Sequence, residues 1–304
     1  GWNRLNKRLY SKKKSDAVSG YLFLLPALLA FLLFIGAPMV ITIVLSFFDY
    51  NMLQGSEWIN FDNYIEFFKN PTSWQIIWNT FKLTLILVAL HIVIALLLAF
   101  VIYKEKRGPV KYVYRTAVYL PSILTTASVA IAWYYMFNYD LGVFNWLLSQ
   151  LGISGVKWLT SSSGVIVAIC LFSLWKFVGT PFLYYLIGLQ GIPDGYYEAA
   201  QIDGANKIQT FFHITLPMLT PTLFFVITIT TINTFQIFDE PYIITNGGPG
   251  NASRTLALHV YEKAFKAYEM GYASSVSVVL FIIVLVITII LYSTQNKWVT
   301  YDVE

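Results

Sequence analysis

The residues with the clearest binding chemistry form a polar stripe in a long segment that has no charged side chain. Between positions 208 and 238 the chain contains no Asp, Glu, Lys or Arg, yet Thr230, Asn233, Thr234 and Ile237 recur at intervals of three and four residues. That spacing places them on one face of a helix. Hydroxyl and amide groups both donate and accept hydrogen bonds, which suits a ligand rich in hydroxyl groups, such as a sugar. The alternative is hydrogen bonding to a neighbouring helix, where Thr and Asn are also common.

A second group of candidate binding residues interrupts the preceding apolar segment. Gly179 and Pro181 are expected to kink its helix, because proline has no N–H and frees a carbonyl that a neighbour or a ligand must satisfy. The rings of Phe182 and Tyr185 could stack on the apolar face of a pyranose. Lys176 is a lone charge at this depth, and three roles are open to it: binding an anionic ligand group, extending to the membrane surface, or pairing with a partner's carboxylate.

The next segment, 190–217, is a connecting loop that is neither short nor basic. A helix of about 195–203 is expected to end at Gly204, since glycine readily adopts the left-handed conformation that closes a helix. Asn206 and Gln209 have the spacing of a capping box, which predicts a second helix. We therefore expect a rigid helix–turn–helix bent at Gly204, which a partner's surface could approach closely. A simple hairpin at the membrane surface is the alternative.

The elements that must position these residues are apolar segments long enough to cross a membrane. Of the 304 residues, 57% are hydrophobic and only 12% are charged, against roughly 25% charged in a soluble domain. Six windows lack any charged side chain, and a spanning helix needs about 20 apolar residues. The composition therefore predicts an all-α integral membrane protein with six transmembrane helices. The expected spans are 21–48, 76–103, 117–138, 164–189, 218–238 and 272–293.

The charges of the connecting segments predict how the chain is oriented. Six crossings place both termini on one side, whose segments carry 13 Lys and Arg residues against 5 on the other side. Because basic segments stay in the cytoplasm, both termini are predicted to be cytoplasmic. The expected organisation is a basic N-terminal segment at 1–20, a six-helix transmembrane domain at 21–293 and a tail at 294–304. The basic segment is expected to anchor the first helix, with lipid recognition as the alternative.

The same sequence argues against several other classes of protein. A net charge of +4 is too small and too dispersed for nucleic acid binding. A single cysteine, Cys170, excludes a disulfide framework and a thiolate metal site. No Gly-x-x-x-x-Gly-Lys-Ser/Thr motif is present to cradle ATP phosphates. The first apolar segment is too long for a signal peptide and is expected to be a retained anchor.

The loop at 190–217 carries a family signature. Its matching positions are Glu198, Ala199, Ala200, Gly204, Ile214, Leu216 and Pro217. They resemble the EAA motif of permeases from binding-protein-dependent ABC importers: EAA, three residues, Gly, nine residues, Ile, one residue, Leu-Pro. In that family the loop is the coupling helix, which docks into a cytoplasmic ATPase subunit. The resemblance implies ATPase-coupling roles for Tyr197, Glu198, Ala199, Ala200, Asp203 and Gly204.

Three further stretches resemble the carbohydrate-uptake branch of that family, the maltose and glycerol-phosphate permease type. They are Gly20-Tyr-Leu-Phe-Leu-Leu-Pro-Ala, Leu45-Ser-Phe-Phe-Asp-Tyr-Asn and Thr245-Asn-Gly-Gly-Pro249, so the likeness extends over about 20–293. It implies the type I ABC importer permease fold. It also implies that the polar stripe and the segment around Gly179 line the substrate cavity. The large external insertion of the maltose permease is absent, which leaves the sugar open.

The resemblance also implies an assembly, because six helices cannot form the whole pathway in this family. The chain would be the permease subunit of an importer of a di- or oligosaccharide, in the bacterial cell membrane and in contact with lipid, and not itself an enzyme. Its expected partners are a second homologous permease, two ATPase subunits that bind ATP and Mg, and an extracellular solute-binding protein. The loop at 239–271 would face that binding protein.

A different class of function remains as the rival. A stand-alone secondary sugar carrier or channel with six spans would need no ATPase, and coupling to an ion would require carboxylates within its spans. The six charge-free windows contain no Asp or Glu, which counts against this alternative.

Overall fold

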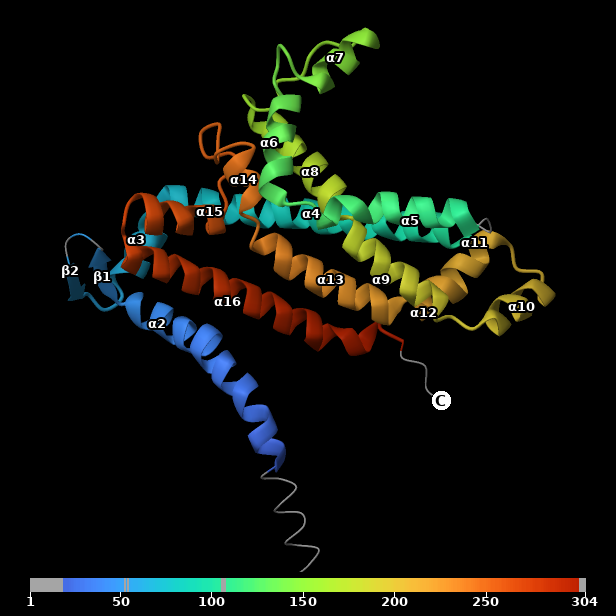
Figure 1. Cartoon of the computed structure of the whole chain (residues 1–304), viewed down its shortest axis with the longest axis horizontal. Coiled ribbons are helices and arrows are strands. Elements are labelled where there is room, and N and C mark those ends of the chain that lie inside the picture. Colours follow the sequence, from blue (N-terminus) through green and yellow to red (C-terminus); the bar gives the residue numbers. More distant parts are fainter. Residues whose placement is uncertain (1–18, 52, 54, 105–107, 301–304) are drawn as a thin grey trace, which may run out of the picture.

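The computed structural model describes residues 19–51, 53, 55–104 and 108–300, and these form a bundle of long helices with one small hairpin (Figure 1). Within these ranges four helices are long and apolar enough to cross a membrane, and two bent helix pairs would raise the number to six. The four are Ser19–Leu45, which ends in α2 (Ala37–Leu45), then α4 (Pro71–Lys104), Thr220–Ile243 and α16 (Met270–Thr294). Most of the basic N-terminal segment and the last four residues of the tail lie outside the described residues.

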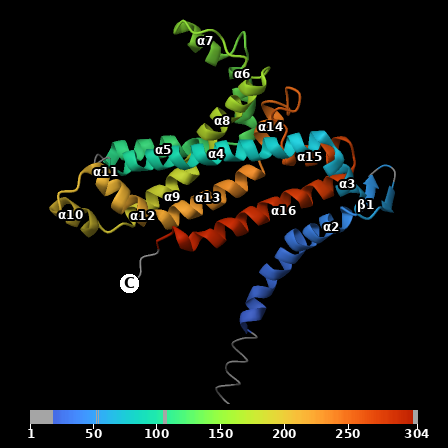
Figure 2. The same ribbon diagram turned by 180° about the vertical axis from the view of Figure 1, so that it is seen from behind.

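The third expected span is not one helix. The chain instead forms α5 (Gly108–Ile123) and α6 (Thr126–Met136), which meet at an angle of 98°. Pro121 lies inside α5 and has no N–H to extend the helix, and Thr125 has an extended backbone that starts α6 afresh. As a result α6 and the short α7 (Val143–Gln150) form an arm that projects from the bundle (Figures 1 and 2).

The kink expected in the fourth span is present. The helices α8 (Ser162–Phe177) and α9 (Gly179–Gln190) bend by 47° at Val178. The hydroxyl of Ser122 on α5 donates to the Lys176 carbonyl at 3.1 Å, so a neighbouring helix satisfies a carbonyl at the bend. A Cβ on Gly179 would lie 2.7 Å from the carbonyl oxygen of Val118. Only glycine therefore allows α9 to approach α5 this closely.

The two ends of the bundle are built differently. One end carries the loop helices α10 (Asp194–Ile202), α11 (Lys207–Thr210) and α12 (Leu216–Met218), and the other carries α3 (Asp62–Lys69), α15 (Leu256–Tyr261) and a hairpin (Figures 1 and 2). The hairpin pairs β1 (Phe48–Asn51) with β2 (Gly55–Trp58), and it was not expected from the sequence. The rings of Phe48 and Trp58 pack edge to face across it at 5.0 Å, a pairing that stabilises antiparallel strands. The described part of the chain also contains three short π-helical turns, at Leu32–Gly36, Phe211–Thr215 and Glu262–Lys266.

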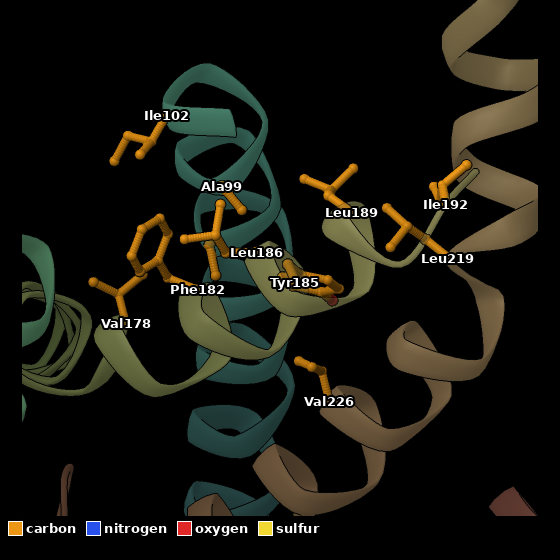
Figure 3. Close-up of a cluster of buried hydrophobic side chains, with 11 residues drawn as sticks. Ala99, Ile102, Val178, Phe182, Tyr185, Leu186, Leu189, Ile192, Leu219 and Val226 are labelled. Atoms are coloured by element: carbon orange, nitrogen blue, oxygen red, sulfur yellow. The ribbon is translucent and has the colours of Figure 1, made fainter. Parts of the chain in front are cut away.

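The largest apolar core forms where α9 packs against α4 and α13 (Thr220–Phe235) (Figure 3). Its buried side chains include Ala99 of α4, Phe182, Tyr185 and Leu186 of α9, and Val226 of α13. These interlocking side chains hold α9 and α13 in fixed rotation about their own axes. That rotation decides which of their residues face the neighbouring cavity.

Candidate ligand cavity and coupling loop

A cavity of about 460 Å³ lies among α4, the bent pair α8–α9, α13 and the short α14 (Asp239–Ile243). Its wall combines hydroxyl, amide, aromatic and acidic side chains. From α4 and α8–α9 come His91, Ser173, Phe177, Thr180, Pro181 and Tyr184. From α13 to α14 come Ile229, Thr230, Asn233, Thr234, Gln236, Ile237, Phe238, Asp239 and Glu240.

All four residues of the polar stripe lie on this cavity wall. They do not offer equivalent groups, because the hydroxyl of Thr234 donates to the carbonyl of Thr230 at 2.8 Å, within the helix. Asn233 and Gln236 are exposed, and across the described ranges neither amide makes a hydrogen bond. Asn233 and Gln236 therefore each offer the cavity an amide that makes no other hydrogen bond, and Gln236 was not among the candidate residues.

Phe182 and Tyr185 lie elsewhere, and the expectation that they stack on a ligand needs correction. Both side chains are completely buried in the core between α4 and α13 (Figure 3). Residues three apart on a helix share a face, and for this pair that face is turned away from the cavity. Phe177, Tyr184 and Phe238 supply the aromatic rings of the wall instead.

Lys176 and Gly179 also have roles different from the ones expected. The Lys176 side chain is only 1% exposed, and its Nζ donates to the carbonyls of Pro121 at 2.8 Å and Ser122 at 3.2 Å. It thus donates to two carbonyls at the end of α5, where the regular helical hydrogen bonding stops; the Pro121 carbonyl also accepts the Leu124 N–H at 3.2 Å. Neither Lys176 nor Gly179 lines the cavity. Gly179 provides the close contact with α5 described above.

His91 and Glu240 also line the cavity, although neither was a candidate binding residue. His91 of α4 has Nδ1 at 2.7 Å from the Leu87 carbonyl and Nε2 at 3.2 Å from the Ser173 carbonyl, so it joins α4 to α8. Glu240 is 4% exposed, although it follows the charge-free window by only two residues. Its position four residues after Gln236, directly beyond the polar segment, is the signal that could have marked it as a wall residue.

The expected geometry of the candidate coupling loop, residues 190–217, is confirmed. The helix α10 ends at Ile202, and Gly204 follows with a φ of +76°, which favours glycine strongly. The capping box of α11 is complete: the Asn206 side chain accepts from the Gln209 N–H at 2.9 Å, and the Gln209 side chain accepts from the Asn206 N–H at 2.8 Å. These caps fix the bend between α10 and α11.

The candidate coupling residues divide between a packed face and an exposed one. Ala200 is buried, and the hydroxyl of Tyr197 lies 3.2 Å from that of Thr215, so these two hold the loop against the bundle. The exposed residues are Glu198, Ala199, Asp203 and Gly204. Beside them Ile202 and Ile208 are 85% and 71% exposed. Two large apolar side chains on a capped loop outside the spans are a surface suited to a partner protein.

Comparison with known proteins identifies the family. Residues 91–300 match the family described as binding-protein-dependent transport system inner membrane component. The probable ABC transporter permease protein YesP of Bacillus subtilis is 38% identical over 294 residues, which cover 95% of this chain and 94% of that protein. The sulfoquinovosyl glycerol transport system permease protein SmoG of Agrobacterium fabrum is 36% identical, with 90% and 89% covered.

Two further similarities support the same placement. The arabinooligosaccharides transport system permease protein AraP of Bacillus subtilis is 33% identical over 95% of this chain and 90% of its own length. A chain in the crystal structure of a bacterial alginate ABC transporter shares the fold, with a TM-score of 0.85, 23% identity and coverage of 97% and 100%. The chain therefore belongs to the binding-protein-dependent transport system inner membrane components, and it is a permease subunit of ABC importers rather than an enzyme.

Proposed function

We propose that the chain is the transmembrane permease subunit of an ATP-driven, binding-protein-dependent importer of a di- or oligosaccharide. The observation that carries this proposal is the cavity beside α13, whose wall contains the exposed amides of Asn233 and Gln236 and the ring of Tyr184. Amides that donate and accept, beside an aromatic ring, suit a polyhydroxylated ring compound. Relatives named for arabinooligosaccharides and for trehalose and maltose, at 33% and 34% identity, support the same class.

The proposed topology has six spans and cytoplasmic termini. The two bent pairs α5–α6 and α8–α9 each count as one span in this arrangement. The backbone N–H of Thr300 donates to the hydroxyl of Thr220 at 2.8 Å, which holds the end of the chain beside the loop that carries the EAA motif. The basic segments and this loop then lie on the cytoplasmic side.

The proposed partners each correspond to a surface of the chain. The exposed Ile202 and Ile208 would enter a cleft of a cytoplasmic ATPase, which supplies ATP and Mg chemistry from a separate polypeptide. The first helix, Ser19–Leu45, has an apolar window with no buried residue, so a second permease and lipid would cover it. The outer loop at 239–271 would meet the solute-binding protein. ATP-driven closure of the ATPase pair would move the rigid coupling loop and reorient the bundle by alternating access.

The rival, a stand-alone carrier, gains one argument from Glu240, an acidic group on the cavity wall near the end of a span. The experiment that separates the two is reconstitution of the purified chain in liposomes, with and without the subunits that co-purify with it. Uptake that requires ATP and a co-purifying ATPase supports the importer. Uptake by the chain alone without ATP would establish the carrier instead.

A single substitution tests the cavity itself. Asn233→Ala removes a free amide from the wall, and loss of a hydrogen bond to an uncharged ligand is worth about 1 kcal/mol, or roughly fivefold in affinity. Sugar uptake by the reconstituted importer should show a KM raised by that factor, with assembly intact. Thr288→Ala is the matched control, because its hydroxyl on α16 bonds only to the Val284 carbonyl. Unchanged uptake kinetics in Asn233→Ala would remove this residue from the binding site.

A further inference from the structure

The charges on the cavity wall are of one sign. Asp239 and Glu240 both line the cavity, and among the residues that the structure describes no Lys or Arg does so. The Glu240 side chain is 4% exposed and lies in the wall with Ser173, whereas Asp239 is half-buried. Over the described stretches its carboxylate makes no ion pair. A ligand in this cavity therefore meets carboxylates and no fixed cation.

Lys176 lies close enough to Glu240 for the two charges to attract each other, but it is not part of the cavity wall. Its Nζ donates to the carbonyls of Pro121 and Ser122, at 2.8 Å and 3.2 Å, on the α5 side of α8. With 1% of its side chain exposed, it has no surface to offer a ligand. An anionic substituent of a sugar would thus find no ammonium or guanidinium group within the cavity.

The chemistry of this wall favours one class of sugar. Hydroxyl groups donate to carboxylates in charge-assisted hydrogen bonds, which are stronger than neutral ones. A carboxylate, sulfonate or phosphate on the ligand would instead be repelled, and strongly, because a partly enclosed site in a membrane protein screens charges poorly. We infer that the cavity selects uncharged oligosaccharides over acidic ones, and that Glu240 is the specificity-determining residue.

This inference rests on the proposed function and narrows it. Fold alone does not decide the charge of the substrate, since the structural neighbour with a TM-score of 0.83 is described as importing the acidic polysaccharide alginate. The charge of the residues on the cavity wall decides whether a neutral or an acidic sugar is bound. In this chain, Glu240 therefore determines the selectivity between neutral and acidic sugars.

The test is direct binding to the purified complex of this chain with its co-purifying subunits, without the solute-binding protein, which has its own selectivity. Two pools of di- and trisaccharides are offered and read by native mass spectrometry: neutral gluco-, xylo- and arabino-oligosaccharides, and uronate oligosaccharides of the same lengths. Wild type should bind members of the neutral pool at least about tenfold more tightly than any uronate. Equal or tighter binding of uronates would overturn the inference and leave sugar import standing, whereas binding from neither pool would overturn both.

Glu240→Gln isolates the charge, because glutamine keeps the size and one acceptor oxygen. The preference for neutral sugars should shrink severalfold in this variant, with the midpoint of thermal unfolding unchanged. Glu57→Gln, which removes an exposed carboxylate from β2 far from the cavity wall, should keep the wild-type preference. If Glu240→Gln lowers the unfolding midpoint and leaves the preference intact, Glu240 has a structural role and the assignment is wrong.

Discussion

The coupling loop and the cavity wall are stabilised by interactions of different range. In the loop, the bend between α10 and α11 depends on Gly204 and on a capping box made by Asn206 and Gln209, all within six residues. In the wall, the side chains that face the cavity come from α4, α8–α9, α13 and α14, which are far apart in sequence. Local interactions follow from neighbouring residue types, and long-range ones depend on how whole helices pack.

The largest effect is expected from a substitution that changes the backbone conformation of the loop and leaves the cavity wall unchanged. Gly204→Leu should lower the ATP hydrolysis stimulated by sugar-loaded binding protein at least about tenfold, because it strains a left-handed residue and adds bulk to the coupling surface. Nothing lies within 4 Å of the position where its Cβ would be built, so the bundle itself should stay intact.

The matched control for this variant is Gly152→Leu. Gly152 has a φ of +70° and equally open space, but it lies beyond α7 in the projecting arm. Each substitution costs about 1–2 kcal/mol of local backbone strain. Equal effects of the two variants on ATP hydrolysis would mean that strain, and not the coupling surface, explains the loss.

Phe182 and Tyr184 of α9 together test whether core packing determines which side of this helix faces the cavity. Phe182→Ala should lower the free energy of unfolding by about 3 kcal/mol, because Phe182 is buried in the core of Figure 3. Tyr184→Ala should instead weaken sugar binding by about 1 kcal/mol, roughly fivefold in Kd, with a small effect on stability. Thermal unfolding and ligand titration of both variants measure the two effects. The reverse pattern would show that α9 is rotated from the orientation described.

The smallest effect on stability is expected from a substitution that removes the capping box of α11. Asn206→Ala should destabilise the first turn of α11 by about 1 kcal/mol, which exposes the amides of Ile208 and Gln209 to exchange roughly fivefold more often. Hydrogen–deuterium exchange of peptides from this loop measures the change. Lys207→Ala alters the same turn without touching the cap, so equally fast exchange in that variant would contradict the role of Asn206.

The bent helices show how far local reasoning extends into the bundle. Gly179 and Pro181 predicted the kink between α8 and α9, and the structure has it at Val178. The 98° break between α5 and α6 was missed, although Pro121 lies just before it. A proline weakens a helix wherever it occurs, but the size of the bend depends on what the two halves pack against. Here α6 leaves the bundle to form the arm of Figure 1.

The candidate ligand residues show where periodicity stops being informative. The polar stripe of α13 reached the cavity as a group, because a shared helical face moves together. Phe182 and Tyr185 also share a helical face, yet packing turned that pair into the core. Periodicity therefore identifies which residues share a face, and it does not identify what the face meets.

The sequence by itself determined the membrane class, the apolar segments, the capped bend of the coupling loop and the family signature, because these depend on composition or on residues a few positions apart. The tertiary structure alone decided that Lys176 serves the carbonyls at the end of α5 and that Glu240 stands on the cavity wall. Both outcomes depend on contacts between segments more than 50 residues apart, in the first case Lys176 with Pro121. The direction of a side chain at such a contact is set by helix rotation and bending, which are properties of the packed bundle.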